Sequence, residues 1–229
     1  MEILYHEMMV SPDMNPSYLK RVLLAGFEPF NGATENPSAE LVNYFKQNPL
    51  DGIEIDTVIL PVSFYRAEQR LQPKLEQNYD VVLGLGLAAG RNHISVERIA
   101  LNLIDARIPD ETGHQPIDQK VIDGGPLALS TSLPVKAICK ACNELDVPTK
   151  VSYTAGTFVC NATFYQICNY QQKFQPNMLA GFIHVPWFLG QGQEGEGLAK
   201  ELQFSAIAKI LEVCAENPRE INESAGTIS

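Results

Sequence analysis

The segment "TAGTFVCN", from Thr154 to Asn161, places a cysteine after a turn of small residues and at the predicted start of a helix. The sulfur of Cys160 is therefore expected near backbone N–H groups of the first helical turn. Such a position favours the thiolate, which is the form of cysteine that attacks carbonyl carbons. A buried structural cysteine would suit the same local sequence, so position alone leaves both interpretations open.

A histidine that could serve as a base lies in "LAGFIHVPW". His184 stands at the end of a predicted apolar strand, just before Pro186. Functional sites of parallel α/β sheets gather at the carboxyl ends of strands, so we expect His184 and Cys160 to lie together. A single histidine near a core more often serves packing and hydrogen bonding. The pairing with a cysteine, rather than the histidine alone, indicates a base.

A carboxylate that could orient this imidazole lies in "RNHISVERIALNLID", whose apolar and polar residues alternate. The alternation predicts one extended segment and puts Glu97 on a largely apolar face. A charge on such a face requires a partner or a function. Glu97 could hold His184 in one tautomer, as carboxylates do in catalytic triads. An ion pair with Arg91 or Arg98 is the alternative, and it stays open.

These residues depend on a scaffold in which short apolar runs alternate with segments of helical period. Strands are predicted over residues 22–25, 53–60, 81–85, 151–153 and 179–185. Helices are predicted over residues 38–47, 64–77, 134–145, 158–170 and 198–215, with Asn36 as the cap of the first one and Pro37 at its first position. This alternation predicts an α/β sandwich with a largely parallel sheet.

Composition narrows the class of partners. The formal net charge is −10, with only 17 Lys and Arg, so the chain should repel phosphate backbones and anionic membrane surfaces. We therefore expect no nucleic-acid or membrane partner. The first residues lack the pattern of a secretory signal, and no apolar stretch approaches the roughly 20 residues that span a bilayer. A single-domain cytoplasmic protein is the expectation, since no linker or repeat divides the chain.

The five cysteines agree with a reducing compartment, because their number is odd and their spacing is not that of a disulfide framework. Cys139 and Cys142 form a C-x-x-C pair inside the helical segment "VKAICKACNEL". Their spacing of three residues within a helix favours packing over redox chemistry or metal binding.

Five segments in the same order resemble one known family. They are "GFEPFNGATENPS", "VERIALNLIDARIPDETGHQPID", "GGPLALSTSLPVKAI", "SYTAGTFVCN" and "GFIHVPW". Together they are similar to the pyroglutamyl peptidase I family, whose members are also called pyrrolidone-carboxylate peptidases. The similarity extends from about residue 21 to residue 187, and five ordered motifs are far more specific than any one of them.

The resemblance implies a single three-layer α/β/α domain with a mixed, mainly parallel sheet. It also implies a cysteine exopeptidase that removes an N-terminal pyroglutamyl residue from peptides and needs no metal or cofactor. Bacterial members of the family are often homotetramers. On this basis the chain divides into an N-terminal extension (1–20), a peptidase domain (21–216) and a polar C-terminal tail (217–229), which is expected to fray.

The same resemblance assigns roles to individual residues. Glu97, Cys160 and His184 occupy the positions of the family's Glu–Cys–His triad, and Arg91 would lie close to the reacting carbonyl. The pocket for the lactam ring would be lined by Phe27, Phe30, Ile108, Phe158 and Val159. A pyroglutamyl residue has no charged amine, so a mostly apolar pocket suits it. The chain departs from the family pattern in the segment "GLAAGR". Leu87 stands where the family has a glutamine that hydrogen-bonds the lactam, and Ala89 stands where it has a glycine.

Two other classes of protein remain open. Leu87 would fit a non-catalytic or altered-specificity relative that binds peptide N-termini. The segment "VVLGLGLAAGR" also has the look of a dinucleotide-binding loop, since Gly84, Gly86 and Gly90 follow a predicted strand. The residues after Gly90 alternate as a strand, whereas the dinucleotide fingerprint requires a helix there.

A metal site is the weakest alternative. His93 and Glu97 are four residues apart, which places both on one face of a helix, but the segment is predicted to be extended. A third ligand is not evident in the sequence, so no metal is expected.

Overall fold

The computed structural model describes residues 19–192, 196–216 and 220–226. Its main sheet has six strands in the order β2-β1-β3-β8-β4-β7, and β5 and β6 form a separate two-stranded sheet. The strands are β1 (Lys20–Phe27), β2 (Ile53–Leu60), β3 (Val81–Leu87), β4 (Ile94–Glu97), β5 (Ile99–Leu101), β6 (Ala128–Ser130), β7 (Thr149–Ser152) and β8 (Leu179–Val185). The helices are α1 (Pro37–Gln47), α2 (Phe64–Leu75), α3 (Val135–Asn143), α4 (Val159–Phe174) and α5 (Lys200–Glu216).

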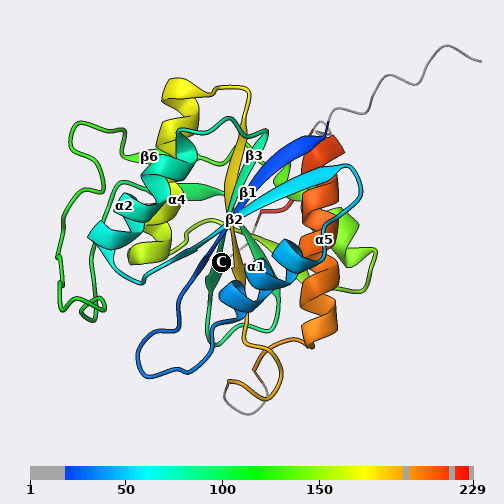
Figure 1. Cartoon of the computed structure of the whole chain (residues 1–229), viewed down its shortest axis with the longest axis horizontal. Helices are drawn as coiled ribbons and strands as arrows, with labels where there is room; N and C mark the ends of the chain where they lie inside the picture. Colours follow the sequence, from blue (N-terminus) through cyan, green and yellow to red (C-terminus); the bar gives the residue numbers. More distant parts are fainter. Residues whose placement is uncertain (1–18, 193–195, 217–219, 227–229) are drawn as a thin grey trace, which may run out of the picture.

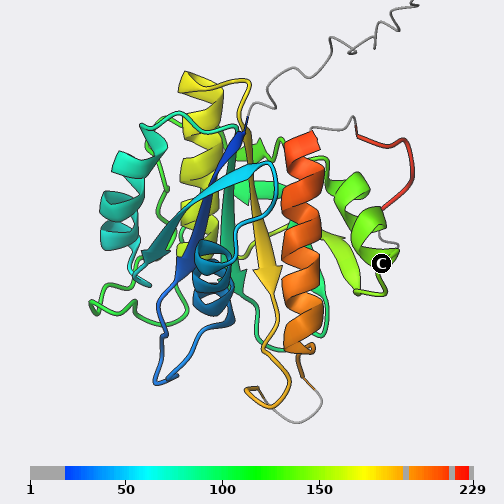
Figure 2. The ribbon, with the colours of Figure 1, turned by 45° about the vertical axis from the view of Figure 1, so that its right-hand side comes forward.

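Helices cover both faces of the main sheet. On one face α1, α3 and α5 bury an apolar cluster, and on the other α2 and α4 bury a second one (Figures 1 and 2). The strands between them are buried on both sides; in β3 and β8 all but one residue each are buried. The prediction of a single three-layer α/β/α domain with a mixed, mainly parallel sheet is confirmed.

The predicted helices and strands are all present; β2 and β8 have the predicted ends, and the ends of the others shift by at most four residues. The start of α1 shows why its prediction was sound. Asn36 accepts a hydrogen bond from the Ser38 backbone N–H at 3.0 Å, and Pro37 occupies the first helical position, where it has no N–H to leave unpaired.

The alternating segment around Glu97 differs from the prediction of one continuous extended run. It breaks at Arg98, so that β4 lies in the main sheet and β5 pairs with β6 outside it. The four residues of β4 are buried on both faces. The apolar neighbours expected on the face of Glu97, Ile99 and Leu101, therefore belong to another sheet.

Strand direction corrects a second expectation. The pair β4 and β8 is antiparallel, and β7 is parallel to β4. The carboxyl ends of β7 and β8 therefore do not share one edge of the sheet, and that argument for bringing Cys160 and His184 together was wrong. The space left by Gly86 on β3, between Cys160 and the strand position of His184, brings them together instead.

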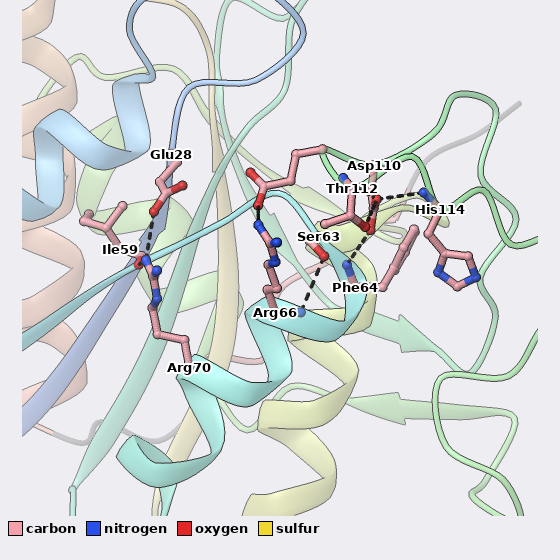
Figure 3. Close-up of polar contacts among 10 residues, drawn as sticks. Glu28, Ile59, Ser63, Phe64, Arg66, Arg70, Asp110, Thr112 and His114 are labelled. Atoms are coloured by element: carbon pink, nitrogen blue, oxygen red, sulfur yellow. Dashed lines mark hydrogen bonds and ion pairs between the residues drawn. The ribbon is translucent and has the colours of Figure 1, made fainter.

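A long connection between β5 and β6 is held against the start of α2 by one carboxylate (Figure 3). Asp110, which is 5% exposed, accepts hydrogen bonds from the backbone N–H of Phe64 at 3.1 Å and of His114 at 3.0 Å. It also accepts from the backbone N–H of Thr112 at 2.8 Å and from its hydroxyl at 2.6 Å. These hydrogen bonds hold the pKa of Asp110 below its ordinary value, although burial opposes them.

The C-terminal segment 220–226 contradicts the expectation of a frayed tail. Glu220 Oε1 accepts hydrogen bonds from the backbone N–H of Lys136 at 3.1 Å and of Ala137 at 3.2 Å, at the start of α3. The hydroxyl of Tyr153 donates to the Ala225 carbonyl at 3.1 Å. The carboxylate thus does for α3 what a capping side chain does elsewhere, since Pro134 has none to offer.

The boundaries 1–20, 21–216 and 217–229 remain a prediction, and residues 1–18, 217–219 and 227–229 lie outside the described residues. Among the described residues, no helix has both the length and the apolar character needed to cross a bilayer.

Candidate active site

The centre of the site is a buried hydrogen bond between neighbouring strands. Nδ1 of His184 donates to Oε1 of Glu97 over 2.8 Å. Glu97 is 0% exposed and His184 is 5% exposed. Their strands β4 and β8 run antiparallel with Glu97 opposite Phe182, two residues before His184. Because Nδ1 carries the proton, Nε2 is the ring nitrogen left to accept one.

Glu97 also has the ion-pair partner that was weighed as an alternative. Nη1 of Arg91 lies 3.3 Å from the same oxygen, Oε1. The two interpretations of Glu97 are therefore compatible: it orients the imidazole and pairs with Arg91. Oε2 of Glu97 is buried without a hydrogen-bond partner among the described residues.

Cys160 reaches this pair because Gly86 lacks a side chain. Gly86 on β3 is in register with His184 on β8, and a Cβ built on Gly86 would lie 2.8 Å from the sulfur of Cys160. The sulfur thus lies over β3, next to the strand position of His184. No hydrogen bond joins Cys160 to His184 among the described residues; such bonds often tighten only when substrate is bound.

The state of the thiol differs from the prediction. Cys160 is partly exposed at a cavity, yet protein atoms closely surround its sulfur. This burial, with the nearby charge of Glu97, raises the pKa of Cys160 to about 12. Burial and Glu97 therefore oppose the thiolate that the helix start was expected to favour, so Cys160 depends on a base for deprotonation.

The helix that carries Cys160 begins without a side-chain cap. Phe158 is the N-cap residue of α4 and accepts no hydrogen bond through its side chain, in contrast to Asn36 at α1 and Ser63 at α2. The first N–H groups of α4 consequently receive no hydrogen bond from an N-cap side chain, and the N–H of Cys160 is directed at its own sulfur. Donors in this position suit an oxygen that gains negative charge.

A cavity of about 320 Å³ opens beside Cys160. Of the residues predicted to contact a ligand, the ones that line it are Phe27, Phe30, Leu87, Ile108 and Phe158. Two others lie elsewhere. The side chain of Val159 is 1% exposed and packs in the core, and Arg91 is held at Glu97.

Further lining residues were not predicted to contact a ligand. They are Asn31, Ala33, Glu35, Val62 and Trp187, with Asn36, predicted as a helix cap, and Ala89, noted as a departure from the family. Most of them lie in two segments. "GFEPFNGATENPS" begins at the end of β1, and "GFIHVPW" contains the end of β8. Position after a central strand was the signal that could have identified them.

The wall that Ile108 contributes is fixed at two points. The backbone N–H of Asp105 donates to the Thr157 carbonyl at 3.1 Å, and the Thr157 hydroxyl donates to the Asp105 carbonyl at 2.8 Å. On the other side of Ile108, Asp110 is held at the start of α2. The loop is thereby attached to α2 (Figure 3) and, through Asp105 and Thr157, to the turn before Cys160.

Two other chemistries lose support. Gly84 and Gly86 lie inside β3, where their missing side chains make room for Phe182 and Cys160, so the dinucleotide-loop interpretation was wrong. No group of three or more His, Cys, Asp or Glu side chains that could hold a metal ion occurs within 19–192, 196–216 and 220–226. The five cysteines are free; Cys142 is buried in the core, as its helical spacing predicts.

An α/β/α sandwich that places a cavity-lining thiol next to a buried imidazole–carboxylate pair has the side chains of a cysteine hydrolase. Comparison with known proteins supports this class. Residues 20–217 match the family model described as pyroglutamyl peptidase, and the chain belongs to this family. It is a hydrolase, a cysteine-type omega peptidase.

Relatives and solved structures agree over most of the chain. It is 38% identical over 204 residues to the pyrrolidone-carboxylate peptidase of Thermococcus litoralis, covering 85% of this chain and 93% of that one. It is 44% identical over 183 residues to that of Klebsiella pneumoniae, covering 77% and 82%. The crystal structure of pyroglutamyl peptidase I from Bacillus amyloliquefaciens superimposes with a TM-score of 0.85 at 36% identity, covering 90% of this chain and 99% of that one.

Proposed function

We propose that this peptidase removes N-terminal pyroglutamyl residues from peptides, with Cys160 as nucleophile, His184 as base and Glu97 as the group that orients the base. The observation that carries the proposal is the buried 2.8 Å hydrogen bond from His184 to Glu97, beside a sulfur that lines an apolar cavity. The names of the relatives support the same substrate class.

The cavity suits a lactam ring. Phe30 and Phe158 lie with ring centroids 5.8 Å apart, and Phe64 packs edge-on against Phe158 at 5.2 Å. Aromatic and aliphatic side chains of this kind cover a flat, uncharged ring, whereas a free α-amino group would need a polar partner.

Acylation begins from the neutral thiol. The sulfur of Cys160 attacks the pyroglutamyl carbonyl carbon as its proton passes to Nε2 of His184. The hydrogen bond at Nδ1 and the charge of Glu97 stabilise the imidazolium that forms. His184 then gives this proton to the leaving amine, the C–N bond breaks, and a thioester on Cys160 remains.

Backbone N–H groups at the start of α4 support the carbonyl oxygen while it carries negative charge. The absence of a side-chain cap at Phe158 leaves these donors available, and the dipole of a 16-residue helix acts in the same direction. Arg91, paired with Oε1 of Glu97, stabilises the negative charge of the carboxylate that orients His184.

Deacylation uses the same groups in reverse. Water loses a proton to Nε2 of His184 and attacks the thioester carbonyl, the C–S bond breaks, and the sulfur recovers the proton. Pyroglutamate and the shortened peptide are the products, and neither a metal nor a cofactor enters the balance.

The experiment is hydrolysis of pyroglutamyl-linked fluorogenic amides by the purified, reduced protein. The proposal expects release of the fluorophore that depends on a reductant. The chief alternative, a peptide-binding relative without activity, rests on Leu87, which lines the cavity. That alternative predicts binding of pyroglutamyl peptides and no release above buffer.

Assembly and location complete the proposal. A homotetramer and a cytoplasmic location remain predictions, the second supported by five free cysteines. Light scattering of the full chain tests the first of these directly.

A further inference from the structure

The cavity that holds Cys160 is lined by two kinds of side chain. The apolar ones include Phe27, Phe30, Val62, Ile108 and Phe158. Asn31, Glu35 and Trp187 add polar atoms and an indole. If the lactam ring packs against the apolar side chains, the residue that follows it in the peptide is free to meet the polar ones.

Glu35 is the one lining residue with a formal charge at neutral pH. It is exposed to solvent at the cavity, and its Oε2 accepts a hydrogen bond from Nε2 of Gln191 at 2.5 Å. An amide donor holds the carboxylate in place without neutralising it.

The cation linked to this hydrogen-bond network is paired with another carboxylate. Nε2 of Gln191 also donates to Glu40 at 3.2 Å, and Glu40 pairs with Lys200 at 2.5 Å. Among the described residues no cation lies within ion-pair distance of Glu35. The negative charge at the cavity is therefore uncompensated.

The indole of Trp187 contacts the segment that holds Glu35. Gln191, which holds Glu35, is followed by Gly192, and a Cβ on Gly192 would lie 2.6 Å from Cδ1 of Trp187. Gly192 thus packs against the indole of Trp187, so one short segment joins the carboxylate to the indole. A carboxylate and an indole that line one cavity can each attract an ammonium or guanidinium group.

We infer that Glu35 and Trp187 form a subsite for a cationic side chain, Lys or Arg, at the residue directly after pyroglutamate. The inference rests on the proposed function, because it names which pyroglutamyl peptides the cavity prefers. It also gives an outcome that apolar lining alone would not produce, namely discrimination by charge outside the ring.

The test compares peptides that differ only in charge at this residue: pyroglutamyl-Lys and pyroglutamyl-acetyl-Lys peptides of otherwise identical sequence. The readout is the ratio of their kcat/KM values, measured as released pyroglutamate. We expect the wild type to prefer the Lys peptide by about 2- to 5-fold, which is the range of a solvent-exposed charge pair. The preference should shrink as salt is added.

Glu35→Gln keeps an acceptor for Gln191 and should bring this ratio close to one, while Glu35→Asp should retain part of the preference. Trp187→Leu should lower the ratio as well. Glu28→Gln removes the same charge from a carboxylate that pairs with Arg70 outside the cavity lining, and it should keep the wild-type ratio.

A ratio that stays at the wild-type value in Glu35→Gln, or a wild type that prefers neutral or acidic residues, would overturn the inference while leaving pyroglutamyl hydrolysis intact. A wild type that cleaves neither peptide would overturn the proposed function and the subsite with it.

Discussion

Oε1 of Glu97 is shared between His184 and Arg91, and this sharing decides how the residues around Cys160 divide their roles. The imidazole receives its orientation and its tautomer from the carboxylate. The sulfur, with its pKa raised to about 12, receives no comparable partner and depends on the imidazole for deprotonation. At the residue scale, Cys160 and His184 therefore act together: the thiol attacks only as the imidazole accepts its proton.

Cys160→Ala and His184→Ala should each remove nearly all turnover with the fold retained, because neither group can replace the other. Glu97→Gln should reduce kcat less, since it weakens the orientation of the base but leaves the base in place. Steady-state hydrolysis of a pyroglutamyl amide and a thermal melt of each variant check this. Cys168→Ala, a buried thiol remote from the chemistry, is the control. A Cys160→Ala variant with a tenth of the wild-type rate would contradict the assignment.

Gly86→Ala should impair the position of the nucleophile. A methyl group there would lie 2.8 Å from the sulfur of Cys160 and 2.9 Å from the ring of Phe182, so one of them must move. A displacement of the reacting atom by about 1 Å can reduce the rate about 100-fold. Gly84→Ala presses on Phe182 alone and is the matched control. Equal kcat in both variants, at equal melting temperature, would refute the direct effect on Cys160.

Leu87→Gln tests the position where the chain departs from the family resemblance. If the lactam lacks a hydrogen-bond partner in this cavity, the unmade bond costs about 1–3 kcal/mol, or about 5- to 150-fold in kcat/KM. Leu87→Gln should then raise kcat/KM by up to that factor. Unchanged or lower kcat/KM, in a variant that melts like the wild type, would indicate that another group or an altered substrate compensates.

At the scale of elements, residue periodicity predicted where helices and strands lie, but not the relative directions of the strands. The helix α1 and the strand β2 could be read from residue spacing because each has one consistent pattern and, for α1, a cap that acts locally. The antiparallel direction of β4 and β7 relative to β8 could not, because the alternation or burial of residues along a strand is the same in either direction. The break at Arg98 and the short strand β6 depend on pairing between distant segments.

The site divides in the same way. Cys160, His184 and Glu97 were recognisable because each is a reactive or charged residue in an otherwise unreactive element. Glu35 and Trp187 follow strands, which could have marked them as site residues, but that they share one cavity depends on the closed fold. The hydrogen bond between Glu35 and Gln191 spans 156 residues, a relation that no local pattern contains.

Asp110→Asn should loosen the loop that carries Ile108. The amide cannot accept all the hydrogen bonds that the carboxylate accepts, and unsatisfied buried donors cost about 1–3 kcal/mol. We expect a lower melting temperature and a KM that rises more than kcat falls. Glu111→Gln, which disturbs a 3.5 Å ion pair with the exposed Arg66, should change stability by less than about 0.5 kcal/mol and is the control.

The pH dependence of this difference has a defined sign. The pKa of Asp110 lies below its ordinary value of 3.8, so the carboxylate stabilises the fold above that pH and loses its contribution as pH falls through the lowered value. The gap in unfolding free energy between wild type and Asp110→Asn should be constant near neutral pH and shrink in acid. A gap that widens in acid would contradict the role given to Asp110.

At the scale of the whole molecule, the C-terminal segment 220–226 contacts both the start of α3 and Tyr153, which follows β7. It caps α3 through Glu220 and contacts Tyr153 through Ala225, while Glu223, Ser224 and Ala225 line a surface hollow with Cys139. The segment is thus part of the packed protein, although the predicted peptidase domain ends at residue 216.

A chain ending at residue 216 should keep pyroglutamyl hydrolysis and lose stability by about 0.5–2 kcal/mol, the usual effect of losing a helix cap. It should also label faster with a thiol reagent at Cys139. Denaturant unfolding and peptide mapping of the labelled protein measure both effects, with Glu220→Gln as an intermediate case. Loss of activity with an intact fold would contradict the predicted boundary at 216.

The central claim, that Cys160 carries the pyroglutamyl group as a thioester, is tested most directly by mass spectrometry of the enzyme quenched during turnover of a pyroglutamyl amide. The account predicts a species heavier by one pyroglutamyl acyl group, mapped to the peptide that contains Cys160 and absent from Cys160→Ala. An acyl group on any other residue, or full turnover by Cys160→Ala, would contradict it.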